Sequence, residues 1–108
     1  MTQSPNISKL GIDLSVCMYC KKAVTVFDRT TDHLFPKSKG GKLSNDNKVP
    51  SCPDCNQLKG DMNVVEFEQF LDASIRFEHM EHKKRIGHLK KVKMNVSTVI
   101  SNFNVKKL

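Results

Sequence analysis

Residues 17–20 read Cys-Met-Tyr-Cys and residues 52–55 read Cys-Pro-Asp-Cys, so the chain carries two cysteine pairs of the same spacing. Two residues between thiolates let a tight turn aim both sulfurs at one ion, and two such turns complete the tetrahedron that structural zinc prefers. We therefore predict that Cys17, Cys20, Cys52 and Cys55 bind one structural zinc ion in preference to forming disulfides. Four cysteine ligands close the site, so this zinc should have no catalytic role.

The composition explains why the chain needs such an ion. Its 108 residues allow one domain, of which only 38% of residues are hydrophobic and 6% aromatic. Ordering a residue costs roughly 1.5 kcal/mol, which a small core offsets only narrowly. Bound structural zinc contributes on the order of 10–16 kcal/mol, enough to stabilise a thin core.

The N-terminal residues carry no secretory signal pattern, and no stretch approaches the ~20 apolar residues of a membrane span. A reducing compartment is then expected, where paired cysteines more often bind metal than each other. We expect a cytoplasmic protein with no membrane partner. If a phage encodes it, the compartment is the cytoplasm of a bacterial host.

The charge favours a polyanionic partner. Lys and Arg number 18 against 11 Asp and Glu, a formal net charge of +7. Phosphates neutralised by Lys or Arg release counterions, which drives nucleic-acid binding. The alternative explanation of the net charge is that it only keeps the protein soluble. The dense basic run of residues 82–93 likewise has two interpretations, as a solvated helix face or as a second contact with nucleic acid.

The chain divides into an N-terminal arm (1–14), a zinc-stapled core (15–62) and a C-terminal helical segment (63–108), which we expect to pack together as one domain. In the core we predict a strand over residues 24–30 and a short extended piece at 48–50.

Residues 63–103 are predicted to be helical throughout. Asn63 is a good N-cap, Glu66 completes a variant of the capping box, and Gly87 should end or bend the helix. Apolar residues recur at helical spacing on both sides of Gly87. They form either core packing or the seam of a homodimer, and the sequence leaves both open.

The candidate residues for metal binding and proton transfer are Asp32, His33 and Asn56. Adjacent residues of an extended strand point to opposite sides, so one of Asp32 and His33 can bind a metal while the other addresses a substrate. Asp and Asn oxygens suit a hard ion such as Mg²⁺, and a neutral imidazole suits proton abstraction from water. Taken alone, the Asp32-His33 pair is typical of a solvated loop, and Asn56 is typical of a turn or helix cap.

Their joint order changes this interpretation. Asp32-His33, a Pro36-x-Ser38-x-Gly40-Gly41 loop, Asn47, and Cys52-x-x-Cys55-Asn56-x-x-Lys59-Gly60 together resemble the HNH endonucleases. The flanking cysteine pairs resemble the four-cysteine branch of that family. The resemblance covers roughly residues 15–62 and implies an α+β fold: a small ββα-metal, treble-clef-like core, followed here by the helical segment.

The resemblance assigns a role to each matching residue. His33 matches the general base that deprotonates water, while Asp32 and Asn56 match the ligands of a catalytic divalent ion. Asn47 matches the residue that pins the loop between the strands and can orient the base. Asn in the last position favours Mg²⁺ or Mn²⁺ over softer metals.

Four lysines are candidates for contact with DNA phosphates. Lys59 follows Asn56 on the same helical turn, and Lys37, Lys39 and Lys42 lie in the glycine-containing loop. The expected activity is metal-dependent hydrolysis of DNA, leaving a 3′-hydroxyl and a 5′-phosphate as the resemblance implies.

Two alternatives share the scaffold: a zinc-dependent module that binds nucleic acid without cutting, and a protein-interaction module. For the nuclease we expect double-stranded DNA as partner, with a homodimer or a targeting protein as further possibilities. The short chain suggests, by analogy alone, a phage or mobile-element product.

Overall fold

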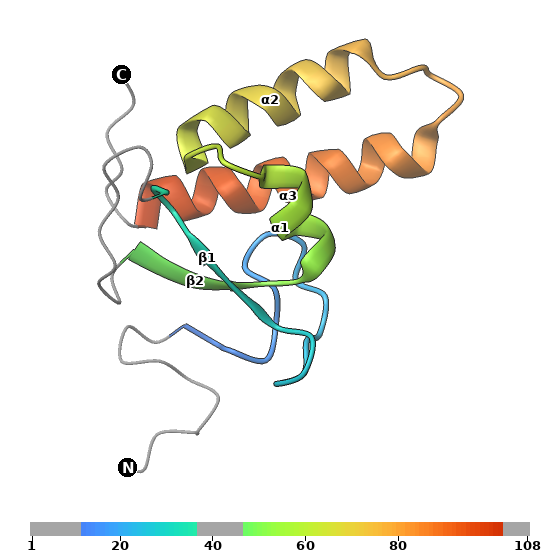
Figure 1. The fold of residues 1–108 in the computed structure, drawn as a ribbon. Helices are drawn as coiled ribbons and strands as arrows, with labels where there is room; N and C mark the ends of the chain where they lie inside the picture. The colour runs from blue at the N-terminus through green and yellow to red at the C-terminus, as the bar shows by residue number, and fades with distance from the viewer. Residues whose placement is uncertain (1–11, 37–46, 103–108) are drawn as a thin grey trace.

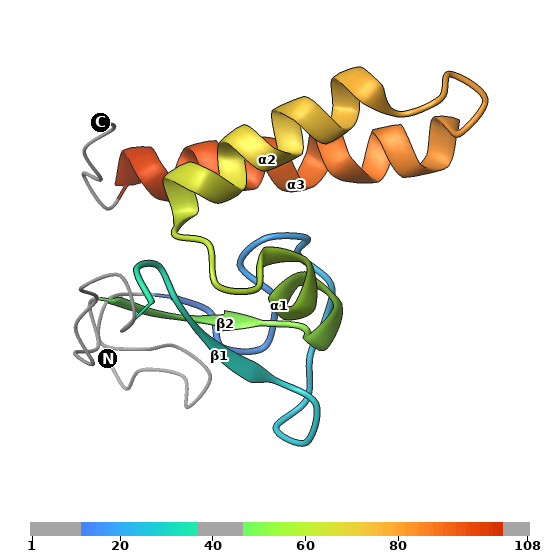
Figure 2. The ribbon, with the colours of Figure 1, turned by 45° about the horizontal axis from the view of Figure 1, so that its top comes forward.

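The computed structural model describes residues 12–36 and 47–102. It contains a two-stranded sheet and three helices, which confirms the α+β class. The elements are β1 (Thr30–His33), β2 (Lys48–Ser51), α1 (Pro53–Lys59), α2 (Val64–Phe77) and α3 (Lys83–Asn102). The helices α2 and α3 run side by side as a hairpin, and α1 lies against the sheet beneath them (Figures 1 and 2).

The two strands pair antiparallel, with Asp32 opposite Val49 and His33 opposite Lys48. The extended piece predicted at residues 48–50 is therefore confirmed as β2, one residue longer than expected. Pro50 has no N–H to donate, but its carbonyl accepts from Met18 N at 2.9 Å, which ties the first cysteine pair to the sheet.

The strand predicted over residues 24–30 is wrong for most of its length. Strand β1 begins only at Thr30, and a turn precedes it. Thr25 donates from its N and Oγ1 to Asp28 Oδ1, at 2.6 and 3.0 Å, and Arg29 N donates to Thr25 O. Local side-chain bonds of this kind satisfy the backbone in place of a strand ladder, and they outweighed the β-propensity of the valines.

The helical segment is interrupted earlier than the sequence indicated. Helix α2 ends at Phe77, and Gly87 lies inside α3 without ending it. Glu78 adopts an extended backbone at the end of α2, and its carboxylate accepts from His82 and Arg85. The N-terminus of α2 matches the prediction, because Asn63 and Glu66 form a complete capping box.

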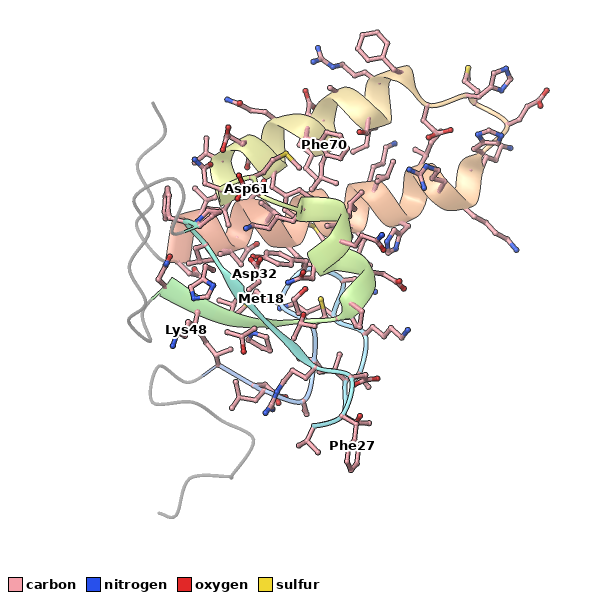
Figure 3. The ribbon with its side chains drawn as sticks, in the orientation of Figure 1. Met18, Phe27, Asp32, Lys48, Asp61 and Phe70 are labelled. Carbon is pink, nitrogen blue, oxygen red and sulfur yellow. The ribbon has the colours of Figure 1, made fainter. Side chains whose placement is uncertain are left out.

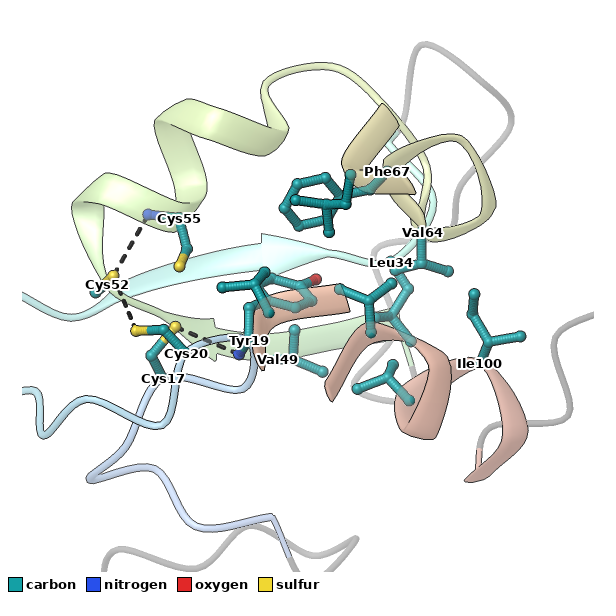
Figure 4. Packing of buried hydrophobic residues seen from close by; sticks show 14 of the residues in the cluster. Cys17, Tyr19, Cys20, Leu34, Val49, Cys52, Cys55, Val64, Phe67 and Ile100 are labelled. Atoms are coloured by element: carbon teal, nitrogen blue, oxygen red, sulfur yellow. Dashed lines mark hydrogen bonds between the residues drawn. The ribbon is translucent and has the colours of Figure 1, made fainter. Parts of the chain in front are cut away.

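One buried apolar cluster runs from the cysteines through the sheet to both long helices. Tyr19 lies at its centre, fully buried, with its ring 5.5 Å from that of Phe67 in an edge-to-face arrangement (Figure 4). Val49 and Leu34 of the sheet region pack into the same cluster. In the described part of the chain, none of the helices combines the length and the apolar character that crossing a membrane requires.

Candidate functional site

The four cysteines meet as a single buried group. Their sulfurs all lie within 4.8 Å of one another, and Cys20 Sγ is 3.8 Å from Cys52 Sγ. A tetrahedron with zinc–sulfur bonds of about 2.3 Å places its sulfurs about 3.8 Å apart. The donor set and its spacing fit a zinc ion, and the cysteines form no disulfide in the structure.

Backbone geometry holds the sulfurs in place. Tyr19 N donates to Cys17 Sγ and Cys55 N donates to Cys52 Sγ, each at 3.4 Å (Figure 4). Cys52 is thereby the N-cap of α1, with Pro53 in the first turn, where its missing N–H costs nothing. Helix α1 thus holds two of the four cysteines, Cys52 as its cap and Cys55 in its first turn, so an ion bound there would also fix the start of the helix.

The arrangement of the thiols favours the deprotonated form of one of them, Cys17. A hydrogen bond from Cys55 lowers the pKa of Cys17 to about 4, while the same bond raises that of Cys55. The sulfurs thus lie close enough to share a proton, in a place where a metal ion would stabilise thiolates.

Asp32 points into the molecule. It is 5% exposed and lies between the sheet and the helices (Figure 3). The Tyr19 hydroxyl donates to Asp32 Oδ2, and Lys59 Nζ lies 3.1 Å from Oδ2 and 3.3 Å from Oδ1. Tyr19, Asp32 and Lys59 thus form a buried polar cluster whose members come from the first cysteine pair, β1 and α1.

Burial decides the protonation behaviour of this cluster. Loss of solvation raises the pKa of Asp32, with the Lys59 ammonium and the Tyr19 hydroxyl acting against the rise. Burial and then the Asp32 charge raise the pKa of Tyr19 well above its usual range. Tyr19 therefore keeps its proton and remains a donor to Asp32 at neutral pH.

His33 ends β1 on the side opposite to Asp32, as alternation along a strand requires. Its backbone carbonyl accepts from Lys59 Nζ at 2.8 Å. Its ring nitrogen Nε2 is buried and has no hydrogen-bond partner among the described residues. Such an atom is costly unless a water or a ligand satisfies it.

Asn47 holds the segment that follows His33. Its side chain accepts from Phe35 N and donates to Phe35 O, both at 2.9 Å, and its carbonyl accepts from Leu34 N. Asn47 itself is buried. The backbone leaving β1 is therefore fixed on both sides of Leu34, which restricts where the His33 ring can lie.

Asn56 lies one helical turn before Lys59 on α1 and is half-buried. Residues three apart share a helix face, and Lys59 reaches both Asp32 and His33 from that face. The fold therefore places Asn56 on the face of α1 that is turned toward β1.

Lys59 is placed differently from what the sequence suggested. Lys59 is 1% exposed, and its ammonium donates to Asp32 Oδ1 and to the His33 carbonyl. In this structure the side chain therefore faces the interior and is not available to a phosphate backbone. Its four-carbon stem packs in the core and only its charge needs a partner, which Asp32 supplies. Lys37, Lys39 and Lys42 lie outside the described residues, as do Gly40 and Gly41.

Tyr19 and Asn95 are contributors that sequence reasoning did not single out. Asn95 Nδ2, on α3, donates to the Tyr19 carbonyl at 2.6 Å, across 76 positions of sequence. A tyrosine between two cysteines gives one usable signal, because a buried phenol needs a partner. No local pattern could identify Asn95, whose contact depends on how α3 packs.

A hollow of about 220 Å³ opens beside the cysteines. Lys22, Arg85 and His88 line it together with Asp54 and three of the cysteines. Lys22 and Arg85 would offset the net negative charge of four thiolates around a bound divalent ion. The histidines of the helical hairpin, His79, His82 and His88, are all exposed.

Comparison with known proteins agrees with this geometry. Residues 17–74, a little over half of the chain, match a family model described as HNH endonuclease. The matched range begins at Cys17 and extends beyond both cysteine pairs into α2. No curated protein matches the chain.

Proposed function

The chain belongs to the HNH endonuclease family, and on that premise we propose that it hydrolyses DNA phosphodiester bonds with His33 as the general base. The observation that carries the proposal is the buried Nε2 of His33, which has no partner among the described residues. A nitrogen held in this way, at the end of a strand fixed by Asn47 and Lys59, is suited to accept a proton from water.

The chemistry of the step is simple. His33 takes one proton from a water molecule as the water oxygen bonds to phosphorus, and the bond from phosphorus to the 3′-oxygen breaks. The 3′-oxygen leaves as an alkoxide and takes a proton from bulk water, while His33 returns its proton to solvent, so the products are a 3′-hydroxyl and a 5′-phosphate. A divalent cation, when bound, offsets the negative charge that develops on the phosphate and leaving oxygens.

The residues proposed to hold that cation are Asp32 and Asn56. A carboxylate has about four lone-pair sites. Tyr19 donates to Oδ2 and Lys59 donates to Oδ1, and Lys59 also forms an ion pair with Oδ2. Each oxygen accepts one hydrogen bond from the described residues, so Asp32 is proposed to bind the cation through a remaining lone pair of either oxygen. With the Asn56 amide oxygen it makes a hard donor set, which favours Mg²⁺ or Mn²⁺.

Zinc has a structural role in this proposal. It joins Cys17 and Cys20 to the start of α1, and α1 carries both Asn56 and Lys59. Loss of the ion should therefore move α1 away from β1 and separate the residues that must act together.

The proposed substrate is double-stranded DNA, in line with the net charge of +7. Lys59 is assigned a different part from a phosphate contact: it neutralises Asp32 and fixes the His33 carbonyl. The loop lysines Lys37, Lys39 and Lys42 keep the proposed phosphate contact.

The test is cleavage of supercoiled plasmid by zinc-loaded protein with Mg²⁺ or Mn²⁺. Native protein should convert the plasmid to nicked or linear forms, and His33→Ala should lower the rate by at least 10²-fold, the usual scale for loss of a general base. Zinc content and thermal unfolding should stay those of the native protein. Equal cleavage by both proteins would overturn the assignment of His33.

One observation favours the non-cleaving alternative. The Lys59 ammonium already gives Asp32 a cation, so the cluster satisfies the carboxylate without any metal. If the native chain binds duplex DNA but cuts no duplex, single-stranded or branched substrate, the chain is a zinc-dependent DNA-binding module on this scaffold.

A further inference from the structure

Positive charge is concentrated on helix α3. Its residues 83–102 include six Lys or Arg and no Asp or Glu, in a chain whose formal net charge is +7. Two of the six cations have carboxylate partners on the facing side of the hairpin, Arg85 at Glu78 and Lys93 at Asp72. The other four are exposed and have no acidic partner within the described part of the chain, and we call them the lysine quartet: Lys83, Lys84, Lys90 and Lys91.

The lysine quartet surrounds Gly87. Its members lie four and three residues before this glycine and three and four residues after it, which are the neighbouring positions on a helix surface. Leu89 and Val92 are buried on the opposite side of α3, so the face of the quartet is turned to solvent. A Cβ at Gly87 would meet nothing within 4 Å. No side chain therefore stands between the four ammonium groups.

This arrangement works against the stability of the helix. Lysines three and four residues apart repel one another, and Lys83 and Lys84 place positive charge in the first turn, where the helix dipole favours negative charge. A glycine inside the helix weakens it further. The quartet gains no contact within the described residues in return, so its arrangement points to a partner outside the chain.

We propose that the lysine quartet binds the phosphate backbone of duplex DNA, as a contact separate from the site at His33. The inference rests on the proposed function in taking DNA as the partner. Lysines that neutralise phosphates release counterions, which supplies the binding free energy. Two helical turns separate the two halves of the quartet, about 10.5 Å along the axis, and this length is comparable to three phosphates of one strand at about 3.4 Å each.

The position of the quartet sets what it can contribute. The start of α3 and the end of β1, where His33 lies, are at opposite ends of the molecule in both views of the ribbon (Figures 1 and 2). The quartet is therefore remote from the scissile phosphate. Its contribution is to affinity for the duplex, with no part in the chemical step.

The experiment measures the binding of zinc-loaded full-length protein to a fluorescently labelled DNA duplex by anisotropy, over a series of salt concentrations and without Mg²⁺ or Mn²⁺. The variants are Lys83→Gln/Lys90→Gln and Lys84→Gln/Lys91→Gln, in which glutamine preserves helix propensity. Each lost phosphate contact should lower the slope of log affinity against log salt by about 0.9 and weaken binding in 0.1 M salt by about 8-fold. Slopes equal to that of the native protein in both variants would overturn the proposal.

The matched control is Arg76→Gln/Lys93→Gln. It removes the same formal charge from the same hairpin, but both of its cations already pair with Asp72. Salt slope and affinity should stay close to those of the native protein. An equal loss in the control and in the quartet variants would show a response to net charge alone and contradict a defined contact.

A second test uses Gly87, because substitution there can separate DNA affinity from folding. Gly87→Glu places a carboxylate among the four lysines, while Gly87→Gln adds a neutral side chain of the same size. Both should raise the thermal midpoint above that of the native protein, since both residues favour the helix more than glycine does. Gly87→Glu should bind DNA about 8-fold more weakly than Gly87→Gln, as for one lost contact, and equal affinities would overturn the proposal.

Plasmid cleavage separates this proposal from the proposed nuclease activity. If the quartet variants lose DNA affinity and the native protein cuts no DNA, the quartet contact stands and the nuclease assignment fails. If the native protein cuts plasmid and the quartet variants bind duplex as tightly as it does, the nuclease stands and the quartet contact is overturned. Binding to vesicles of anionic lipid that depends on the quartet, with DNA affinity unchanged by its removal, would likewise overturn it.

Discussion

At the scale of single residues, Asp32 and Lys59 depend on each other. Both are buried, and each is the charged partner of the other. A buried charge that loses its partner retains the cost of its desolvation, so removing one member of a pair is more damaging than replacing both. The sequence analysis assigned Asp32 to a metal ion and Lys59 to a DNA phosphate, and nothing in the local pattern indicated that α1 turns Lys59 inward to Asp32.

We predict that Lys59→Met lowers the free energy of unfolding of the zinc-loaded protein by about 3–5 kcal/mol, because it leaves the Asp32 carboxylate buried beside Tyr19 alone. The double variant Lys59→Met/Asp32→Asn should recover most of that loss. Urea unfolding followed by circular dichroism measures both.

The control for this prediction is Lys91→Met, on an exposed position of α3. It should change the free energy of unfolding by less than about 0.5 kcal/mol. Similar losses for Lys59→Met and Lys91→Met would contradict the importance of the buried pair.

At the scale of elements, the sequence predicted those features that depend on local chemistry. The capping box of Asn63 and Glu66 and the short strand at 48–51 were accessible in this way. The turn at 25–28 was not, because bonds between Thr25 and Asp28 compete with β-propensity on nearly equal terms. The end of α2 depends on the reach of His82 and Arg85 back to Glu78, which a periodic pattern does not encode.

Gly87 shows why the helical break was misplaced. Glycine costs a helix only about 1 kcal/mol relative to alanine, and the burial of Leu89 and Val92 on the same helix exceeds that cost. A Cβ at Gly87 would meet nothing within 4 Å.

Gly87→Ala should accordingly stabilise the protein by about 0.5–1 kcal/mol. The gain should appear as a higher thermal midpoint at unchanged zinc content, with DNA cleavage left as in the native protein. A lower midpoint would mean that α3 needs glycine here for a contact not present in this structure.

At the scale of the whole molecule, the resemblance in residues 15–62 anticipated the core, and the family match confirms it. How the helical hairpin joins that core could not be anticipated. The contacts of Tyr19 with Phe67 and Asn95 arise from packing between segments far apart in sequence. Periodicity identifies the apolar faces of helices, but not which residue of the core they meet.

Removal of zinc should unfold the chain in one transition. Among the described residues the buried cluster includes all four cysteines, so we expect the core to lose its packing as a unit when the ion is removed. Chelator titration followed by circular dichroism should show loss of helix from α2 and α3 together with loss of zinc, and addition of Zn²⁺ should restore it. Helical content that persists without zinc would show that the hairpin folds independently.

The spacing of the two cysteine pairs also has a consequence for biosynthesis. Cys20 and Cys52 are 32 positions apart, and β1, Asn47 and β2 all lie within the loop they close. During translation the first pair leaves the ribosome well before the second, so the ion cannot be enclosed until Cys55 emerges. Loop-closure entropy opposes the encounter of the two pairs, and metal coordination offsets it. With zinc as the proposed ion, zinc supply to the nascent chain would set when the molecule folds, and a chain made in zinc-starved cells would stay unfolded until the ion binds.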